Sequence, residues 1–180
     1  MQVPIHTIDS APADSRALLE GIASDLGVIP NLAATAAASP ALLAGFDGLR
    51  RAVATTKLDP VLREVAGLAV GVTVDNHYGV AFHSTMLGGL GVDNADIDAM
   101  RHGDAPSDSV AAAVHALARL AADGRGKVDP ATTEAALAAG LSTEAVLEVL
   151  LEVSFATVVG LIDNFTGPVE LDRFLAERRW

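Results

Sequence analysis

Helix-start signals recur along the chain and leave little room for other secondary structure. Ser39-Pro40, Asp59-Pro60 and Asp129-Pro130 each pair a good N-cap residue with a proline, which is favoured at the first helical position. Ser107 and Ser142 are predicted to be further N-caps. Glycines stand where the helices would stop, at Gly27, Gly91, Gly103, Gly124 and Gly140. Because no segment shows sustained strand alternation, the sequence predicts an all-α fold of about eight to ten helices.

The predicted helices follow one another with short connections. Their ranges are 14–26, 31–38, 40–55, 60–73, 76–90, 94–102, 108–122, 130–139 and 143–165, with a short C-terminal helix near 168–177. No Ser/Gly linker or block of charges divides the chain. We therefore expect residues 1–180 to form a single domain, with residues 1–12 as an extended N-terminal arm.

The charge and the cysteine count exclude several classes of function. The formal net charge is −11, so the chain repels phosphate backbones and anionic lipid, and we expect no nucleic-acid or membrane partner. The N-terminus has no basic region followed by an apolar one, as a signal peptide would, which favours a soluble cytoplasmic protein. The chain has no cysteine. No disulfide, thiolate metal site or cysteine nucleophile can therefore form.

The apolar share of the chain is high for its length. Hydrophobic residues make up 51% of the 180 residues, and the mean hydropathy is +0.38. Short soluble chains of this kind often bury part of their apolar surface between subunits, which favours a homo-oligomer. Near the C-terminus, Glu144, Glu148 and Glu152 recur every four residues. We interpret them as a solvated face, opposite an apolar face with Val146, Leu147, Leu150 and Leu151.

The stretch from Arg63 to Leu90 carries the candidate chemistry. In its first helix, Glu64 shares a face with Gly67 and Gly71, and such small residues leave room for a close neighbour helix or a pocket.

In the second helix of this stretch, Asn76, Gly79 and His83 share one face. Gly79 costs about 1 kcal/mol of helix propensity relative to alanine, which suggests that the space beside it is needed. The free N–H groups at the start of this helix would favour an anion. If the two helix faces meet, Glu64 lies next to His83.

The spacing of these residues resembles the motif of the carboxymuconolactone decarboxylase and alkylhydroperoxidase-D-like (AhpD-like) superfamily. Typical members carry a Glu and, about a dozen residues later, Cys-x-x-Cys-x-x-x-His. Here Glu64 matches the Glu and His83 matches the His, whereas Asn76 and Gly79 occupy the two cysteine positions. The run DNHYGVAFHSTM is similar to the family's NxCxYCxxAHS-type run with both thiols removed.

The flanking segments agree with this resemblance. The upstream LGVIPNLAATAAASPALLAGFDGL and the downstream GLSTEAVLEVLLEVSFATVVGLIDNF are similar to the corresponding parts of the family, so that the resemblance covers roughly residues 20–175. It implies an AhpD-like helical bundle that assembles into symmetric trimers or hexamers. The AhpD branch of the family uses the two cysteines as a redox pair, with the Glu and His as a proton relay, to reduce peroxides or disulfides. The decarboxylase branch handles small carboxylated lactones by proton transfer.

The missing thiols point toward the decarboxylase branch, or toward a protein that has lost catalysis. Our prediction is a cofactor-free enzyme in which Glu64 and His83 move protons on a small organic acid, by decarboxylation, isomerisation or lactone chemistry. His83 suits this role because the unperturbed pKa of histidine is about 6.5. Two alternatives remain open. One is an AhpD-type oxidoreductase by family without the redox cysteines, and the other is a non-catalytic oligomer that binds a small ligand or another protein.

The remaining candidates are predicted to bind the substrate. Asn76, Gly79, His77 and Tyr78 lie around the start of the second helix. For each of them, as for His83 and Glu64, a purely structural role is the alternative. We expect no metal, because His77 and His83 are six residues apart, which is neither the i+3 nor the i+4 spacing of helical zinc ligands.

Overall fold

The computed structural model describes residues 1–180 and is helical throughout, without strands. Nine α-helices are followed by one 3₁₀ helix. The bounds are α1 Ala13–Leu26, α2 Asn31–Ala36, α3 Pro40–Val53, α4 Pro60–Thr73, α5 His77–Gly89, α6 Asn94–Arg101, α7 Ser109–Asp123, α8 Pro130–Ala138, α9 Thr143–Thr166 and η1 Arg173–Arg178. The predicted all-α fold is therefore confirmed.

Local capping explains most of these boundaries. Ser39 accepts a hydrogen bond from the backbone N–H of Leu42, and Asp59, Asp129 and Ser142 cap α4, α8 and α9 in the same manner. Gly27 ends α1 in the left-handed conformation, with φ of 73°. Side-chain capping satisfies N–H groups that a helix cannot satisfy internally, so these boundaries can be read from the sequence.

Three predictions about boundaries were wrong. Asp108, not Ser107, caps α7, because its carboxylate accepts from two backbone N–H groups of the first turn. Ser107 instead donates to Asp96 of α6. The helix α2 ends at Ala36 rather than near residue 38. The C-terminal helix is a 3₁₀ helix that begins only at Arg173.

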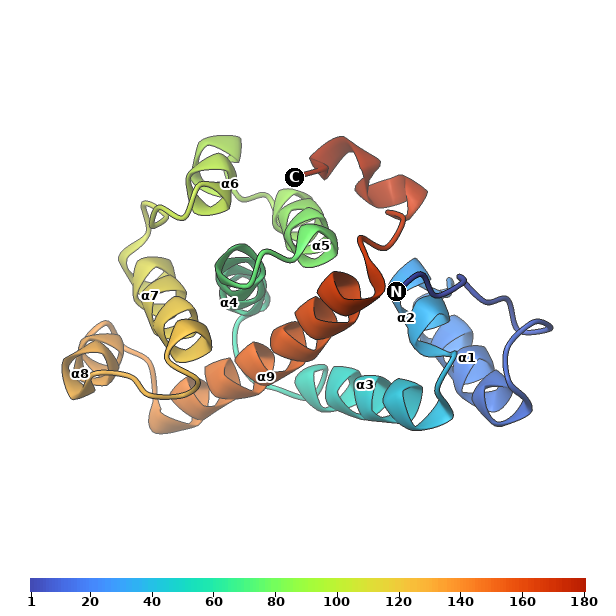
Figure 1. Cartoon of the computed structure of the whole chain (residues 1–180). Coiled ribbons are helices and arrows are strands. Elements are labelled where there is room, and N and C mark those ends of the chain that lie inside the picture. Colours follow the sequence, from blue (N-terminus) through green and yellow to red (C-terminus); the bar gives the residue numbers. More distant parts are fainter.

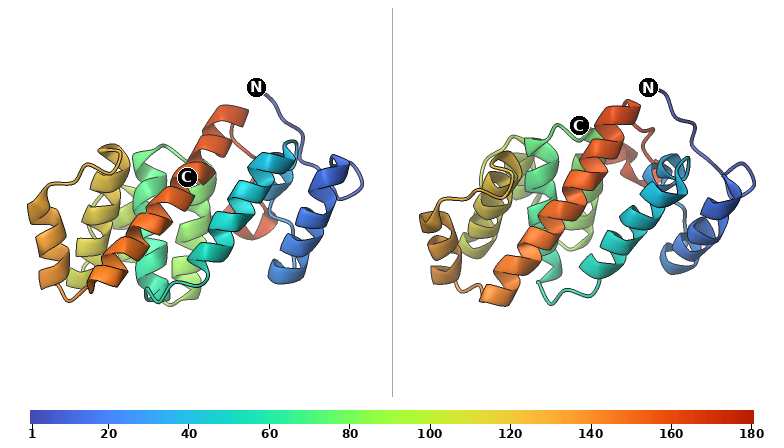
Figure 2. Two further views of the ribbon diagram at one scale, coloured as in Figure 1. Left: turned by 90° about the horizontal axis from the view of Figure 1, so that it is seen from below. Right: turned by 60° about the horizontal axis from the view of Figure 1, so that its bottom comes forward.

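The helix α4 forms the centre of the molecule. Figure 1 shows it nearly end-on, with α5, α6, α7 and α9 around it. The views in Figure 2 show α1 and α8 at opposite ends of an elongated molecule, with α9 running between α3 and α7. One core cluster joins α4 to α5, α6, α7 and α9, and a second joins α1, α2 and α3 to α5 and α9. Because α5 and α9 contribute to both clusters, their side chains contact residues of both clusters.

The helix α9 is long and apolar enough to cross a membrane, by length and composition alone. In the fold it is a core helix that packs against α3, α4, α5 and α7. It also carries Glu152 and Asp163, both buried inside the protein. The buried part of its apolar surface therefore belongs to the core of the fold.

Candidate active site

Glu64 of α4 and His83 of α5 form a buried pair at the seam between the two helices. The distance from His83 Nδ1 to Glu64 Oε2 is 2.8 Å. The two residues are 7% and 6% exposed, respectively. The predicted approach of these two side chains is therefore confirmed, whereas their catalytic roles stay a prediction.

Gly67 of α4 makes this approach possible. A Cβ atom at position 67 would overlap the imidazole ring of His83, with its nearest contact to Cε1. Gly71, one turn further along α4, gives similar room to the backbone of α5 near Val80. The glycines that share a face with Glu64 therefore serve to seat the histidine and its helix directly on the backbone of α4.

The pair keeps both partners charged in spite of its burial. Burial lowers the pKa of His83, but the hydrogen bond and the charge of Glu64, with a smaller effect of Glu152, raise it above its ordinary value. Burial raises the pKa of Glu64, yet His83 and the neighbouring Arg63 together bring it below its ordinary value. The imidazolium and the carboxylate thus stabilise each other, which favours the protonated form of His83.

The other ring nitrogen of His83, Nε2, is not engaged by the protein. His83 Nε2 has no hydrogen-bond partner in the protein, and the residue lines a cavity of about 140 Å³. A dry cavity of roughly 150 Å³ lined by apolar side chains can hold a single benzene molecule. The lining residues come from α1, α2 and the loop before it, α3, α5 and α9: Leu26, Pro30, Leu32, Phe46, Arg50, Tyr78, Gly79, Phe82, His83, Phe155 and Val159. This arrangement presents one proton-transfer group to a small, largely apolar ligand.

Glu152 of α9 is a third ionisable residue of this site, and the sequence prediction for it was wrong. It is 2% exposed, and its Oε2 atom has no hydrogen-bond partner. Burial raises its pKa to about 7, while the charge of His83 lowers the pKa and that of Glu64 raises it. Val149, Val153 and Ala156 are buried with it. The sequence gave no local signal for this burial, because α9 is apolar on most of its sides.

The start of α5 does not offer the anion site that the sequence predicts. The backbone N–H of Gly79 donates to Asn76 Oδ1, and that of Tyr78 donates to the buried carboxylate of Asp163. Asp163 also accepts from the backbone N–H of Val169. The chain therefore supplies its own anion at this helix terminus, and Asn76 is an N-cap residue rather than a ligand to the substrate.

The space beside Gly79 is also filled from within. A Cβ atom at position 79 would collide with the side-chain amide of Asn76, although Gly79 itself borders the cavity. The Nδ2 atom of Asn76 is buried and has no partner. The residues at the two cysteine positions of the family motif thus pack against each other as a unit.

Tyr78 and His77 lie on different sides of α5. The ring of Tyr78 lines the cavity, but its hydroxyl donates to Asp172. Burial and that carboxylate raise the pKa of the phenol further above its ordinary value, so the hydroxyl stays protonated. His77 is exposed, donates from its Nδ1–H to the backbone oxygen of Trp180, and is not among the residues that line the cavity. The structure thus brings Tyr78, but not His77, to the site.

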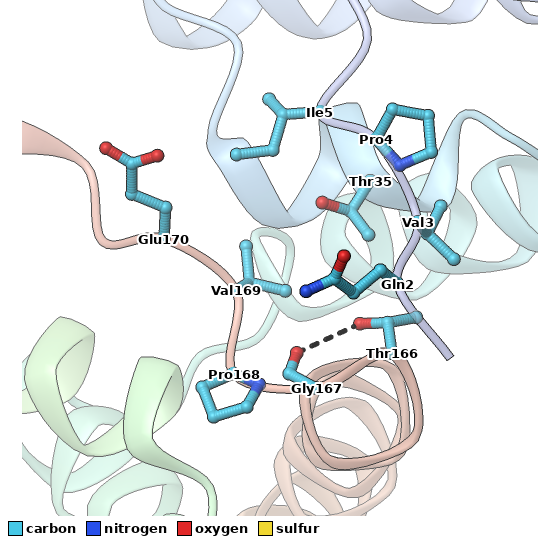
Figure 3. Close-up of a pocket in the computed structure, with 10 residues that line it drawn as sticks. All are labelled: Gln2, Val3, Pro4, Ile5, Thr35, Thr166, Gly167, Pro168, Val169 and Glu170. Carbon is cyan, nitrogen blue, oxygen red and sulfur yellow. Dashed lines mark hydrogen bonds between the residues drawn. The ribbon is translucent and has the colours of Figure 1, made fainter.

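A larger cavity, of about 510 Å³, lies elsewhere and lacks comparable chemistry. Figure 3 shows its lining residues, which come from the N-terminal arm, from α2, from the end of α9 and from the loop after it. Glu170 is the only titratable side chain among them. The smaller cavity beside His83 is therefore the better candidate for an active site.

Comparison with known families agrees with the motif in the sequence. Residues 40–123 match the model of the Carboxymuconolactone decarboxylase family, and this segment contains both Glu64 and His83. No curated protein sequence matches the chain significantly. The evidence from sequence therefore comes from the family model alone.

Solved structures share the fold over nearly the whole chain. The AhpD-core, peroxidase-related protein from Ralstonia eutropha JMP134 superimposes with a TM-score of 0.81 at 19% identity, covering 97% of this chain and 93% of that one. The debrominase Bmp8, in a variant bound to 2,3,4-tribromopyrrole, gives 0.78 at 15% identity, with 99% and 95% covered. A peroxidase-related protein from Silicibacter sp. TM1040 gives 0.77 at 15% identity, with 96% and 91% covered.

These structures establish an AhpD-like all-α fold. The match over residues 40–123 and this shared fold support the predicted assignment to the carboxymuconolactone decarboxylase and AhpD-like superfamily.

Proposed function

We propose that the protein is a thiol-independent acid–base enzyme that acts on a small organic acid. One observation carries this proposal: the buried His83–Glu64 pair leaves His83 Nε2 without a partner, in a residue that lines a cavity of about 140 Å³. A positioned histidine of this kind typically contributes a factor of 10²–10⁴ to a rate.

The raised pKa of His83 favours the imidazolium form. In a decarboxylation, the C–C electron pair stays on the substrate carbon as CO₂ leaves, and His83 Nε2 donates its proton to that carbon. In an isomerisation, the neutral ring takes a proton from one carbon and returns it to another. Throughout, Glu64 accepts the Nδ1–H hydrogen bond and stabilises the charged ring. No oxidant or reductant is needed.

A thiol mechanism has no chemical basis in this chain. Thiol peroxidases need a thiolate nucleophile, and the sequence contains no cysteine. The small cavity suits a single ring. In support of that size, the debrominase neighbour of the same fold was solved with 2,3,4-tribromopyrrole bound. We therefore infer an organic acid built on one ring as the substrate.

Proton exchange in D₂O tests the proposal without knowledge of the pathway. Small carboxylic acids that raise the melting temperature of the protein are incubated with it in D₂O, and carbon-bound deuterium is measured by NMR. We expect exchange or turnover of at least one such acid with the wild-type protein and with His115→Gln, but not with His83→Gln. His115 is a suitable control because it is a buried histidine outside the cavity. If ligands bind but neither exchange nor turnover depends on His83, the protein is a non-catalytic binder.

We also propose that the protein is a cytoplasmic homo-oligomer in which α9 contacts a second copy of the chain. Leu147, Leu150, Leu161 and Phe165 are 60%, 45%, 65% and 72% exposed and follow one face of α9. This uncharged stripe can pair with itself, whereas a net charge of −11 repels copies elsewhere. Light scattering should give a multiple of 18.4 kDa, and Leu161→Glu should lower the mass. A wild-type mass of one chain at micromolar concentration would contradict this proposal.

A further inference from the structure

The cavity beside His83 has an unusual charge for this protein. Its only basic lining residues are Arg50 and His83, and no carboxylate lines it. The chain as a whole carries 23 acidic against 12 basic residues. A cationic, otherwise apolar cavity in an acidic protein points to an anionic ligand with an apolar body.

Arg50 is held in place by carboxylates on its outer side. Its Nε donates to Asp47 Oδ1 at 2.8 Å, and its Nη2 donates to Asp25 Oδ2 of α1 at 2.7 Å. A guanidinium carries five N–H donors in a fixed fork. The Nη1 group of Arg50 makes no hydrogen bond within the protein, although the side chain is only 14% exposed. Two donors of a fixed and largely buried cation are therefore available.

The carboxylates that hold Arg50 balance its charge but leave its Nη1 donors unused. Burial raises the pKa of Asp47, but hydrogen bonds from Arg51 and Arg50 bring it below its ordinary value, so this residue stays ionised. Arg51 bonds both Asp47 and Asp25 as well. Two cations and two anions make this group neutral, and the unused donors of Arg50 remain the local positive end.

From this geometry we propose that Arg50 is the anion-binding and specificity-determining residue of the cavity. The ligand class is a monocarboxylate with one ring: the ring fills the apolar cavity next to His83, and the carboxylate accepts hydrogen bonds from Arg50 Nη1. This inference rests on the proposed function, because it assigns the acid group of that substrate to a particular residue. The sequence offered no sign of it, since Arg50 and Arg51 are indistinguishable there.

Binding of benzoate and of its neutral analogue benzamide tests the proposal. Both have a ring of the size that the cavity admits, and only benzoate carries the charge. By titration calorimetry we expect the wild-type protein to prefer benzoate by roughly 10- to 100-fold, as is usual for a charged hydrogen bond. Arg50→Gln should abolish the preference. The matched control is Arg51→Gln, which removes a guanidinium with the same two aspartate partners but outside the cavity.

Three results would overturn the proposal: equal binding of benzoate and benzamide by the wild-type protein, an unchanged preference in Arg50→Gln, or an equal loss in Arg51→Gln. If Arg50→Gln does not fold, Arg50→Lys replaces it. If the Arg50→Lys variant then prefers benzoate over benzamide as strongly as the wild-type protein does, the guanidinium of Arg50 is not what binds the carboxylate. The outcome is separable from that of the proposed function. His83→Gln should abolish proton exchange but keep the Arg50-dependent preference for benzoate. Either the exchange result or the binding result can therefore fail without the other.

Discussion

Two histidines lie buried on central helices, and their surroundings shift their pKa values in opposite directions. His83 of α5 is hydrogen-bonded to Glu64, and its pKa is raised despite burial. His115 of α7 is 3% exposed, its Nε2 has no partner, and burial, together with the charge of Arg119, lowers its pKa. Without a hydrogen-bonded carboxylate, burial thus favours the neutral form of a histidine. The carboxylate from a neighbouring helix, not the interior position, makes His83 a candidate acid.

The largest effect is expected from removing that carboxylate. Glu64→Gln should lower the rate of proton exchange by about 10²–10⁴-fold. It should also move the pKa of His83 down, toward the behaviour of His115, because burial is then opposed only by the weaker effect of Glu152. Activity assays and a ¹H–¹⁵N NMR titration of the histidines measure both quantities. An unchanged pKa of His83 would refute the explanation of the difference between the two histidines.

The buried Glu152 should make stability fall as the pH rises. Its pKa is about 7 in the folded protein, against about 4.3 for an unfolded chain, so the folded state holds an extra proton between these values. The resulting loss of stability is about 4 kcal/mol. Glu152→Gln should remove it, raising stability at pH 8 much more than at pH 4.

Urea denaturation at pH 4 and at pH 8 measures this difference. Glu144→Gln is the matched control on the same helix, because Glu144 is exposed and pairs only with Lys57. Such surface pairs contribute about 0–1 kcal/mol. An equal change of the pH dependence in both variants would argue against a special role of Glu152.

Position 67 of α4, against which the ring of His83 packs, should tolerate no residue larger than glycine. Gly67→Ala places a methyl group in the imidazole ring and should destabilise the protein by about 2 kcal/mol, as is usual when a packed site is overfilled. Gly45→Ala in α3 is the control, since nothing lies within 4 Å of its added Cβ, and it should stabilise by about 0.5–1 kcal/mol. Thermal unfolding measures both. Similar effects of the two variants would mean that the close contact of α4 with His83 is not needed.

The smallest effect is expected at the other histidine. His115→Leu removes a buried Nε2 that has no partner and keeps a side chain of similar size. Stability should stay the same or rise by about 1 kcal/mol, because an unsatisfied polar group is lost. Proton exchange should not change. A marked loss of stability would show that His115 makes a polar contact after all, and the contrast with His83 would then weaken.

The sequence by itself determined the helices and the motif. Capping residues such as Ser39 and Asp59 act on N–H groups two or three positions away, so helix boundaries follow from local chemistry. The helix faces of Glu64 and His83, together with the family resemblance, also predicted that these two side chains meet. Both inferences, the helix boundaries and the shared helix faces, depend on patterns within single helices, which a sequence displays directly.

Only the tertiary structure decided which side chains are left without partners. The helix α9 is apolar on most sides, so its pattern could not show that Glu152 turns inward while Leu147 and Phe165 face outward. The role of the α5 terminus was likewise decided by Asp163, which reaches it from α9 across 85 residues of sequence. Arg50 borders the cavity only because α3 packs beside α9 and α1. Partners that come from distant segments depend on how helices pack, and packing is not a local property of the chain.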